Sequence, residues 1–86
     1  MSNDKVEEVT NPTEAEARAR EFIKKRHIRV KQIFFKTVQR EGNVWFLEGK
    51  VSFGFILTVA RTFQLSINPE NGEVTSYEET RLRNVQ

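Results

Sequence analysis

The amino-acid sequence predicts an α+β roll, in which one N-terminal helix packs on a curved four-stranded antiparallel sheet. Two observations lead to this fold class. A helix-start signal near residue 11 opens one amphipathic segment, and four stretches rich in β-branched and aromatic residues follow it. Short turn sequences separate these stretches, which favours sequential antiparallel pairing. The 86 residues have the size of one domain, which we expect to span residues 11–86.

The clearest strand signal lies in Thr62–Arg83, which we interpret as two strands joined by the turn Asn68–Gly72. Phe63, Leu65 and Ile67 alternate with polar residues, which is the period of a half-buried strand. The proline of the turn presets φ, and its Asn-Gly pair tolerates positive φ. This hairpin is therefore expected to complete the sheet.

The predicted helix has two overlapping start signals. Asn11 could cap the helix with Pro12 at the first helical position, or Thr13 and Glu16 could form a capping box. The basic residues at positions 24–27 complement the C-terminal end of the helix dipole. One face has small residues early and large ones late, at helical spacing: Ala15, Ala19, Phe22, Ile23 and Arg26. The small residues would let the helix lie close to a sheet.

The first two strands are expected at Ile28–Arg40 and Val44–Phe53, with a Glu-Gly-Asn turn between them. In the first strand the apolar parity changes midway, so we expect a bulge or bend near Lys31 and Gln32. The second strand alternates cleanly, and Gly49 in its buried row indicates a bend or a close backbone approach. The buried row is Trp45, Leu47, Gly49, Val51 and Phe53, and the opposite row is Val44, Phe46, Glu48, Lys50 and Ser52.

Two segments have no clear period. Met1–Thr10 is polar, and we expect it to be a mobile tail. Gly54 is expected to end the second strand. Phe55–Arg61 is either a long connection or the start of the third strand.

One helix covers only one face of a four-stranded sheet, so the second face should contact solvent or a partner. We predict that Val44, Phe46 and Tyr77 form a protein-binding patch on this open face, with Phe34 as a further member. Alternatively, they form a small hydrophobic cluster under the N-terminal tail or a contact between two copies. The expected partner is another protein, or the protein itself as a homodimer.

Positive charge is concentrated in the middle of the chain. Arg18–Arg40 contains nine basic residues and one acidic residue, whereas the segments on both sides are net acidic. Such a region could contact the phosphates of a nucleic acid. The candidate nucleic-acid-binding residues are Lys24, Lys25, Arg26, Arg29 and Lys31. Alternatively, the first three complement the helix C-terminus and the other two lie on the solvated face of a strand.

The sequence offers few groups for catalysis. It has no cysteine and one histidine, His27, from which neither a catalytic triad nor a nitrogen- or sulfur-rich metal site can be assembled. We expect His27, at the end of the helix, to complement the helix dipole or to snorkel towards solvent. Glu78 and Glu79 are strand neighbours that point to opposite faces, so we expect them to charge a sheet edge rather than to form a dyad. We predict no enzymatic activity, catalytic residue, metal or cofactor.

The longest weakly polar run, Val51–Ala60, has ten residues, about half of the length that spans a bilayer. Met1–Lys5 lacks the apolar region of a secretory signal. We therefore expect a cytoplasmic protein with no membrane partner.

The order of a helix, a bent strand, a strand with Trp45 near its start and a Pro/Asn/Gly hairpin resembles the PepSY-like domains and the wider cystatin-like roll. Phe63–Tyr77, with Gly-Glu-Val after its turn, looks like the ending of that family. The spacing from Trp45 and Glu48 to the tail at Tyr77–Arg83 also resembles the gas-vesicle accessory proteins of the O type. The resemblance covers residues 13–83 in arrangement. It implies this fold and a binding role, and it implies no active-site residue.

The preferred hypothesis is a non-enzymatic cytoplasmic interaction module that uses the open sheet face or an edge strand. The alternative is a nucleic-acid-binding protein that uses the basic region Arg18–Arg40. A third hypothesis is a small enzyme or ligand carrier that uses the concave side of the roll, because such rolls often enclose pockets. Nucleic-acid binding should weaken steeply with salt, whereas sheet-face binding should tolerate it.

Overall fold

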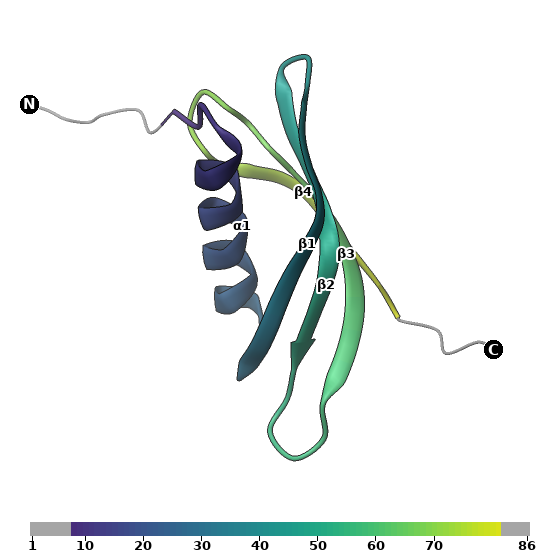
Figure 1. The fold of residues 1–86 in the computed structure, drawn as a ribbon. Helices are drawn as coiled ribbons and strands as arrows, with labels where there is room; N and C mark the ends of the chain where they lie inside the picture. Colours follow the sequence, from purple (N-terminus) through teal and green to yellow (C-terminus); the bar gives the residue numbers. More distant parts are fainter. Residues whose placement is uncertain (1–7, 82–86) are drawn as a thin grey trace, which may run out of the picture.

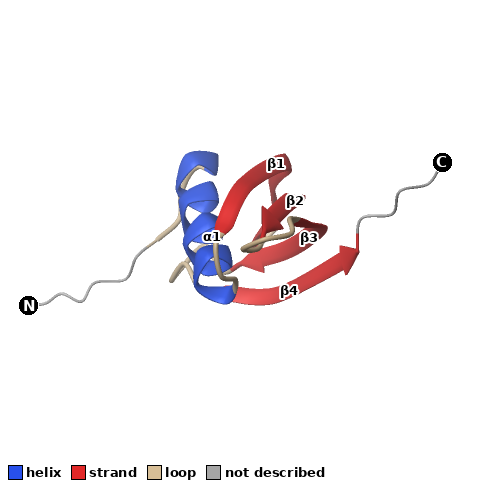
Figure 2. Cartoon of the chain, turned by 90° about the horizontal axis from the view of Figure 1, so that it is seen from below, coloured by secondary structure: helices blue, strands red, loops and turns tan. Residues whose placement is uncertain are grey.

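In the computed structural model, which describes residues 8–81, one helix lies across one face of a four-stranded antiparallel sheet (Figure 1). The sheet has the order β1-β2-β3-β4, and Figure 2 shows it curving around the helix while staying open. The predicted α+β class, with one helix on a curved sheet, is confirmed. The elements are α1 (Pro12–Arg26), β1 (Val30–Glu41), β2 (Val44–Phe53), β3 (Val59–Ile67) and β4 (Val74–Arg81).

The start of α1 uses the first of the two predicted signals. Asn11 is the N-cap, and its Oδ1 accepts a hydrogen bond of 2.9 Å from the backbone N–H of Glu14. Pro12 follows at the start of the helix, where its missing N–H costs nothing. The Glu14 carboxylate in turn accepts the backbone N–H of Thr10 at 2.8 Å. These reciprocal bonds satisfy donors that a helix start would otherwise leave unpaired.

The core lies between α1 and the sheet. The helix contributes Ala15, Ala19 and Ile23, all fully buried, and the two alanines allow close approach to the strands. The sheet contributes alternate residues of its central strands, as the sequence pattern predicts. The buried strand side chains are Trp45, Leu47, Val51, Phe63, Leu65 and Ile67.

Val9, within the segment predicted to be a mobile tail, belongs to this core. Its side chain is buried, and its N–H donates to the carbonyl of Pro69 at 2.7 Å. The indole Nε1–H of Trp45 donates to the Val9 carbonyl at 2.9 Å. The prediction of a tail over residues 1–10 is therefore wrong at Val9, because a single apolar residue shows no period in the sequence. Residues 1–7 lie outside the described part of the chain.

Strand β1 contains the predicted bulge and a second one. The pairing with β2 shifts between Val30 and Gln32, as expected, and again between Phe35 and Thr37. The second shift brings Val38 to the same face as Phe35, although their spacing gives them opposite parity. Through the two bulges, Val30, Ile33, Phe35 and Val38 of β1 all pack against the core on the helix side, whereas Phe34 is exposed.

Gly49 marks a close backbone approach, as predicted. A Cβ atom at this position would lie 1.9 Å from the carbonyl oxygen of Phe34 on the neighbouring strand β1. This contact lies next to the second bulge, where Phe35 pairs with Gly49. Only glycine fits this position without a shift of the β1 backbone.

The connection between β2 and β3 combines the two alternatives left by the sequence. Gly54 ends β2 with φ 127°, as expected. Residues 54–58 form the connection, and β3 begins at Val59. The last hairpin has the predicted turn, in which the N–H of Gly72, with φ 74°, donates to the Asn68 carbonyl at 2.8 Å.

Candidate functional site

Tyr77 does not lie on the open face of the sheet. It pairs with Leu65, and its ring packs on α1, with its centroid 5.2 Å from that of Phe22 and 6.3 Å from that of Phe63. The pairing of β3 with β4 shifts so that Ile67 pairs with Val74 and Ser66 with Ser76, leaving an extra residue in β4. The placement of Tyr77 beside Val44 and Phe46 is therefore wrong, because this irregularity reverses the parity of β4.

Val44 and Phe46 lie on the open face, as predicted, and both are half-buried. The edge strand β1 adds Phe34, whose side chain is 56% exposed. Among the described residues, no helix covers this face (Figure 2). The open face thus has an apolar component that residues 8–81 leave partly in solvent.

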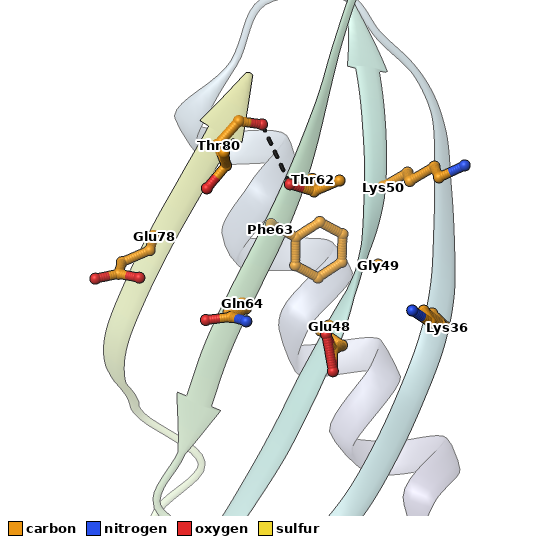
Figure 3. Close-up of a pocket in the computed structure, with 9 residues that line it drawn as sticks. All are labelled: Lys36, Glu48, Gly49, Lys50, Thr62, Phe63, Gln64, Glu78 and Thr80. Carbon is orange, nitrogen blue, oxygen red and sulfur yellow. Dashed lines mark hydrogen bonds between the residues drawn. The ribbon is translucent and has the colours of Figure 1, made fainter. Parts of the chain in front are cut away.

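The centre of the open face is polar and hollowed. A cavity of about 270 Å³ lies there (Figure 3), lined by Lys36, Glu48, Gly49, Lys50, Thr62, Phe63, Gln64, Glu78 and Thr80. Across the central strands, Glu48 pairs with Gln64, and Gln64 pairs with Glu78. On β1, Lys36 directly precedes Thr37, the residue that pairs with Glu48. One row across the sheet therefore has a cation on edge strand β1 and an anion on edge strand β4.

A polar cluster lies on the helix side, at the C-terminal end of α1. Its centre is Glu79 on β4, whose side chain is 11% exposed. Glu79 contacts the imidazole of His27, accepts the Tyr77 hydroxyl at 2.5 Å and pairs with Arg61 Nη1 at 3.2 Å. The imidazole stacks on Phe53 at 3.8 Å between centroids. We refer to His27, Arg61, Tyr77 and Glu79 as the polar cluster.

The electrostatics of the polar cluster keep Glu79 charged. Burial alone would raise its pKa, but the hydrogen bonds from Tyr77 and His27, with the charges of His27 and Arg61, outweigh burial and lower the pKa below its usual value. The pKa of Tyr77 is raised, mainly by burial and then by its hydrogen bond to Glu79. Tyr77 therefore acts as a neutral hydrogen-bond donor, and Glu79 as an anion that accepts from three elements.

The polar cluster shows that the expectation for Glu79 is wrong and gives His27 a contact that the sequence does not predict. Glu79 does not charge a solvent-exposed edge, because β4 turns its side chain inward; Glu78, on the opposite face, is exposed. His27 does sit at the end of the helix, as expected, but its ring is directed to the Glu79 carboxylate. The sequence analysis does not identify Arg61. This residue shares the buried parity of Phe63 and Leu65, and a cation in such a row indicates a buried anion nearby.

The five predicted nucleic-acid-binding residues do not form one uniform surface. Arg26 lies with its guanidinium 4.8 Å from the Tyr77 ring, and Lys24 and Lys25 are exposed on α1. Arg29 lies 4.6 Å from the Phe55 ring, and Lys31 Nζ donates to Thr58 Oγ1 at 2.9 Å. Arg29 and Lys31 are therefore associated with the β2–β3 connection rather than with the helix face.

Comparisons with protein-family models, with curated proteins and with solved structures find no match to this chain. Within residues 8–81, no three histidine, aspartate or glutamate side chains are grouped so that they could hold a metal ion. The same residues include no helix with the length and apolar character needed to cross a bilayer. Two surfaces of the described chain expose large apolar side chains: the open face, with Phe34, and the β2–β3 connection, with residues 55–57.

Proposed function

We propose that this protein is a non-enzymatic interaction module whose open face binds another protein, and that its first partner is a second copy of the chain. The observation that carries the proposal is the row across the open face, with Lys36 on one edge strand and Glu78 on the other. An uncovered sheet face with exposed apolar residues favours packing against a second sheet.

The row is self-complementary about one kind of axis. A two-fold axis parallel to the strands, between two facing sheets, puts β1 of one copy over β4 of the other. Lys36 of each copy then faces Glu78 of its partner, and the contact occurs twice. The same operation places Phe34 of one copy near the polar C-terminal half of the partner's β4, so the interface is mixed in character. Such an interface is typical of transient rather than obligate association.

Charge reversal tests this arrangement. Lys36→Glu should weaken the dimer about tenfold, because two attractive contacts become repulsive. Glu78→Lys should do the same, for the same reason. A mixture of the two single variants should restore association, since one contact then joins the two introduced charges and the other joins Lys36 to Glu78 as in wild type. Sedimentation equilibrium over a range of protein concentrations measures each dissociation constant.

The matched control is Lys24→Glu, which makes the same charge change on the exposed face of α1 and should leave the dissociation constant unchanged. A wild-type chain that stays monomeric at the highest concentration would overturn the self-association. A mixture no more associated than either single variant would overturn the proposed axis.

The third hypothesis, a ligand carrier that uses the concave side of the roll, is not favoured, because the side chains of the core occupy the space between α1 and the sheet.

Nucleic-acid binding is the second candidate function, and Arg29 and Lys31 beside the exposed ring of Phe55 favour it. A cytoplasmic location and kinship with the PepSY-like and gas-vesicle proteins remain predictions.

A further inference from the structure

The two most exposed large hydrophobic side chains of the described chain, Ile56 and Leu57, lie at the tip of the β2–β3 connection, next to the exposed Phe55. Phe55, Ile56 and Leu57 are consecutive and are 67%, 91% and 77% exposed. The molecule is elongated, with extents of 50 × 26 × 18 Å, and this connection forms its lower end in Figure 1. We refer to Phe55, Ile56 and Leu57 as the apolar tip.

The apolar tip belongs to a larger apolar end of the molecule. Six large hydrophobic residues of the described chain are exposed. Besides the apolar tip, they are Val59, which begins β3 directly after the connection, Ile28, which precedes the Arg29 that lies over the Phe55 ring, and Phe34, which lies on the open face. The N–H of Gly54 donates to the carbonyl of Arg29 at 3.1 Å, which holds the segment after α1 against the connection. Single exposed apolar residues are ordinary on soluble proteins, but a contiguous group of them marks an interaction site.

The base of the connection is well defined. A Cβ atom on Gly54 would lie 2.2 Å from the carbonyl oxygen of Leu57, so the backbone turns tightly there. Lys31 bonds to Thr58 on the other side of the base, and the Arg29 guanidinium lies over the Phe55 ring. These contacts present the apolar tip outward with two cations directly beside it.

Charge divides the molecule along its length. The end with the apolar tip has exposed cations on several elements, and the one acidic residue of the polar cluster, Glu79, is already paired. The opposite end has the helix start and the two hairpin turns, where exposed carboxylates collect and Arg40 is the basic exception. The exposed cations of the tip end include Lys24, Lys25, Arg26, Arg29, Lys31, Lys50 and Arg81, and the exposed carboxylates of the far end are Glu8, Glu14, Glu41, Glu70 and Glu73.

We propose that the apolar tip inserts into the surface of an anionic lipid bilayer, with Arg29 and Lys31 at the level of the lipid phosphates. Exposed apolar residues flanked by cations are the combination that binds the interface of anionic membranes. A nucleic acid would use the cations and could stack on Phe55, but it has no apolar phase for Ile56 and Leu57. The acidic far end would point away from the negative surface. This inference goes beyond the proposed function, because the open face takes no part in it.

The expectation of no membrane partner rests on the absence of a spanning segment, which a surface contact does not need. Only side chains of the apolar tip have to enter the interface, and the strands on both sides stay in water. The contact adds a membrane surface to the partners inferred from the sequence.

Vesicle flotation tests the proposal with the full chain, at a protein concentration at which it is monomeric. Wild type should float with vesicles of phosphatidylcholine and phosphatidylserine, and much less with phosphatidylcholine alone. The double variant Ile56→Ser with Leu57→Ser should bind at least about tenfold more weakly, since both apolar side chains lose their burial. Arg29→Glu should weaken binding about tenfold on the anionic vesicles, since it exchanges attraction for repulsion.

Two matched controls separate the tip from general effects. Phe34→Ser removes an exposed apolar side chain of the open face, which is not part of the apolar tip, and Arg40→Glu makes the charge change of Arg29→Glu at the far end. Both should bind the anionic vesicles as wild type does. Phe55→Trp supplies a direct readout, since the emission of the introduced indole should shift to the blue with anionic vesicles while Trp45 stays buried. Circular dichroism confirms that each variant is folded.

Three results would overturn the proposal. Wild type could fail to float with anionic vesicles at low salt. The folded Ile56→Ser, Leu57→Ser variant could bind as well as wild type, or Phe55→Trp could show no shift. Binding of a short mixed-sequence nucleic acid that survives the tip substitutions, together with no vesicle binding, would assign the basic end to nucleic acid instead. The open-face dimer is measured separately, without lipid, so its failure is distinguishable.

Discussion

At the scale of single residues, Glu79 connects more of the structure than any other side chain of the polar cluster. It accepts from His27 at the end of α1, from Arg61 on β3 and from Tyr77 on β4. The ring of His27 also covers Phe53, so the polar cluster closes the core at this end of the molecule. Buried charges of this kind are stable only while all their partners are present. Glu79 therefore ties the helix end to the two C-terminal strands.

The pH dependence of stability follows from Glu79. Its pKa in the folded chain lies below the ordinary value of 4.5, so the folded state binds fewer protons than the unfolded state in this range. The stabilisation is complete above the ordinary pKa and is lost as the pH falls through the folded pKa. We expect Glu79→Gln to lower the free energy of unfolding by about 1–3 kcal/mol at neutral pH and to flatten its decline in acid.

Thermal unfolding followed by circular dichroism at a series of pH values measures this effect. The matched control is Glu78→Gln, the exposed neighbour on the other face, whose acid dependence should equal that of wild type. An unchanged acid profile in Glu79→Gln would show that other carboxylates cause the loss of stability.

At the scale of the elements, the contact between β1 and β2 at Gly49 allows the tightest test. Gly49→Ala would place a Cβ 1.9 Å from the Phe34 carbonyl oxygen, and this backbone atom cannot move aside like the end of a side chain. We expect a loss of about 2–3 kcal/mol in the free energy of unfolding, which is larger than that of the control and is measured by urea denaturation. Gly42→Ala is the control: its φ is 61° and nothing lies within 4 Å, so its cost of about 1 kcal/mol is conformational only. Equal losses for both would refute a steric role for Gly49.

The sequence predicts elements well where the signal is local and periodic. The cap at Asn11, the buried row of β2 and the turn before β4 depend on neighbouring residues, and all are present. It fails where pairing across strands decides the outcome. The shift in the pairing of β4 that turns Tyr77 inward, and the second bulge of β1, arise from long-range register. The burial of Val9 likewise depends on Trp45, far along the chain.

The open face could be predicted from local alternation in the sequence, whereas the apolar tip could not. Val44 and Phe46 follow from simple alternation and lie on the open face as predicted. The sequence does not single out the apolar tip, because a run of Phe-Ile-Leu next to strands looks in sequence like core. Its exposure follows only from the structure, which ends β2 at Phe53 and holds the connection clear of the sheet.

At the scale of the whole molecule, the two proposed surfaces are geometrically compatible. An axis parallel to the strands leaves the strand direction of each copy unchanged, so both copies of the dimer have their apolar tips at the same end. Both tips would then reach one bilayer, with both acidic ends directed away from it. An axis across the strands would instead put the two tips at opposite ends, and only one of them would reach a given bilayer.

This geometry predicts that dimer formation strengthens membrane binding. At a protein concentration that populates the dimer, wild type should bind anionic vesicles about tenfold or more tightly than Lys36→Glu, because the second tip binds at a high effective concentration. Lys36→Glu also differs from wild type in net charge, which by itself would weaken binding to anionic vesicles. The informative comparison is therefore the mixture of Lys36→Glu with Glu78→Lys. That mixture has the average charge of wild type and should bind like wild type in flotation, whereas each variant alone should not. If the mixture binds only as the average of its components, the two tips do not act on the same bilayer and the axis lies across the strands or elsewhere.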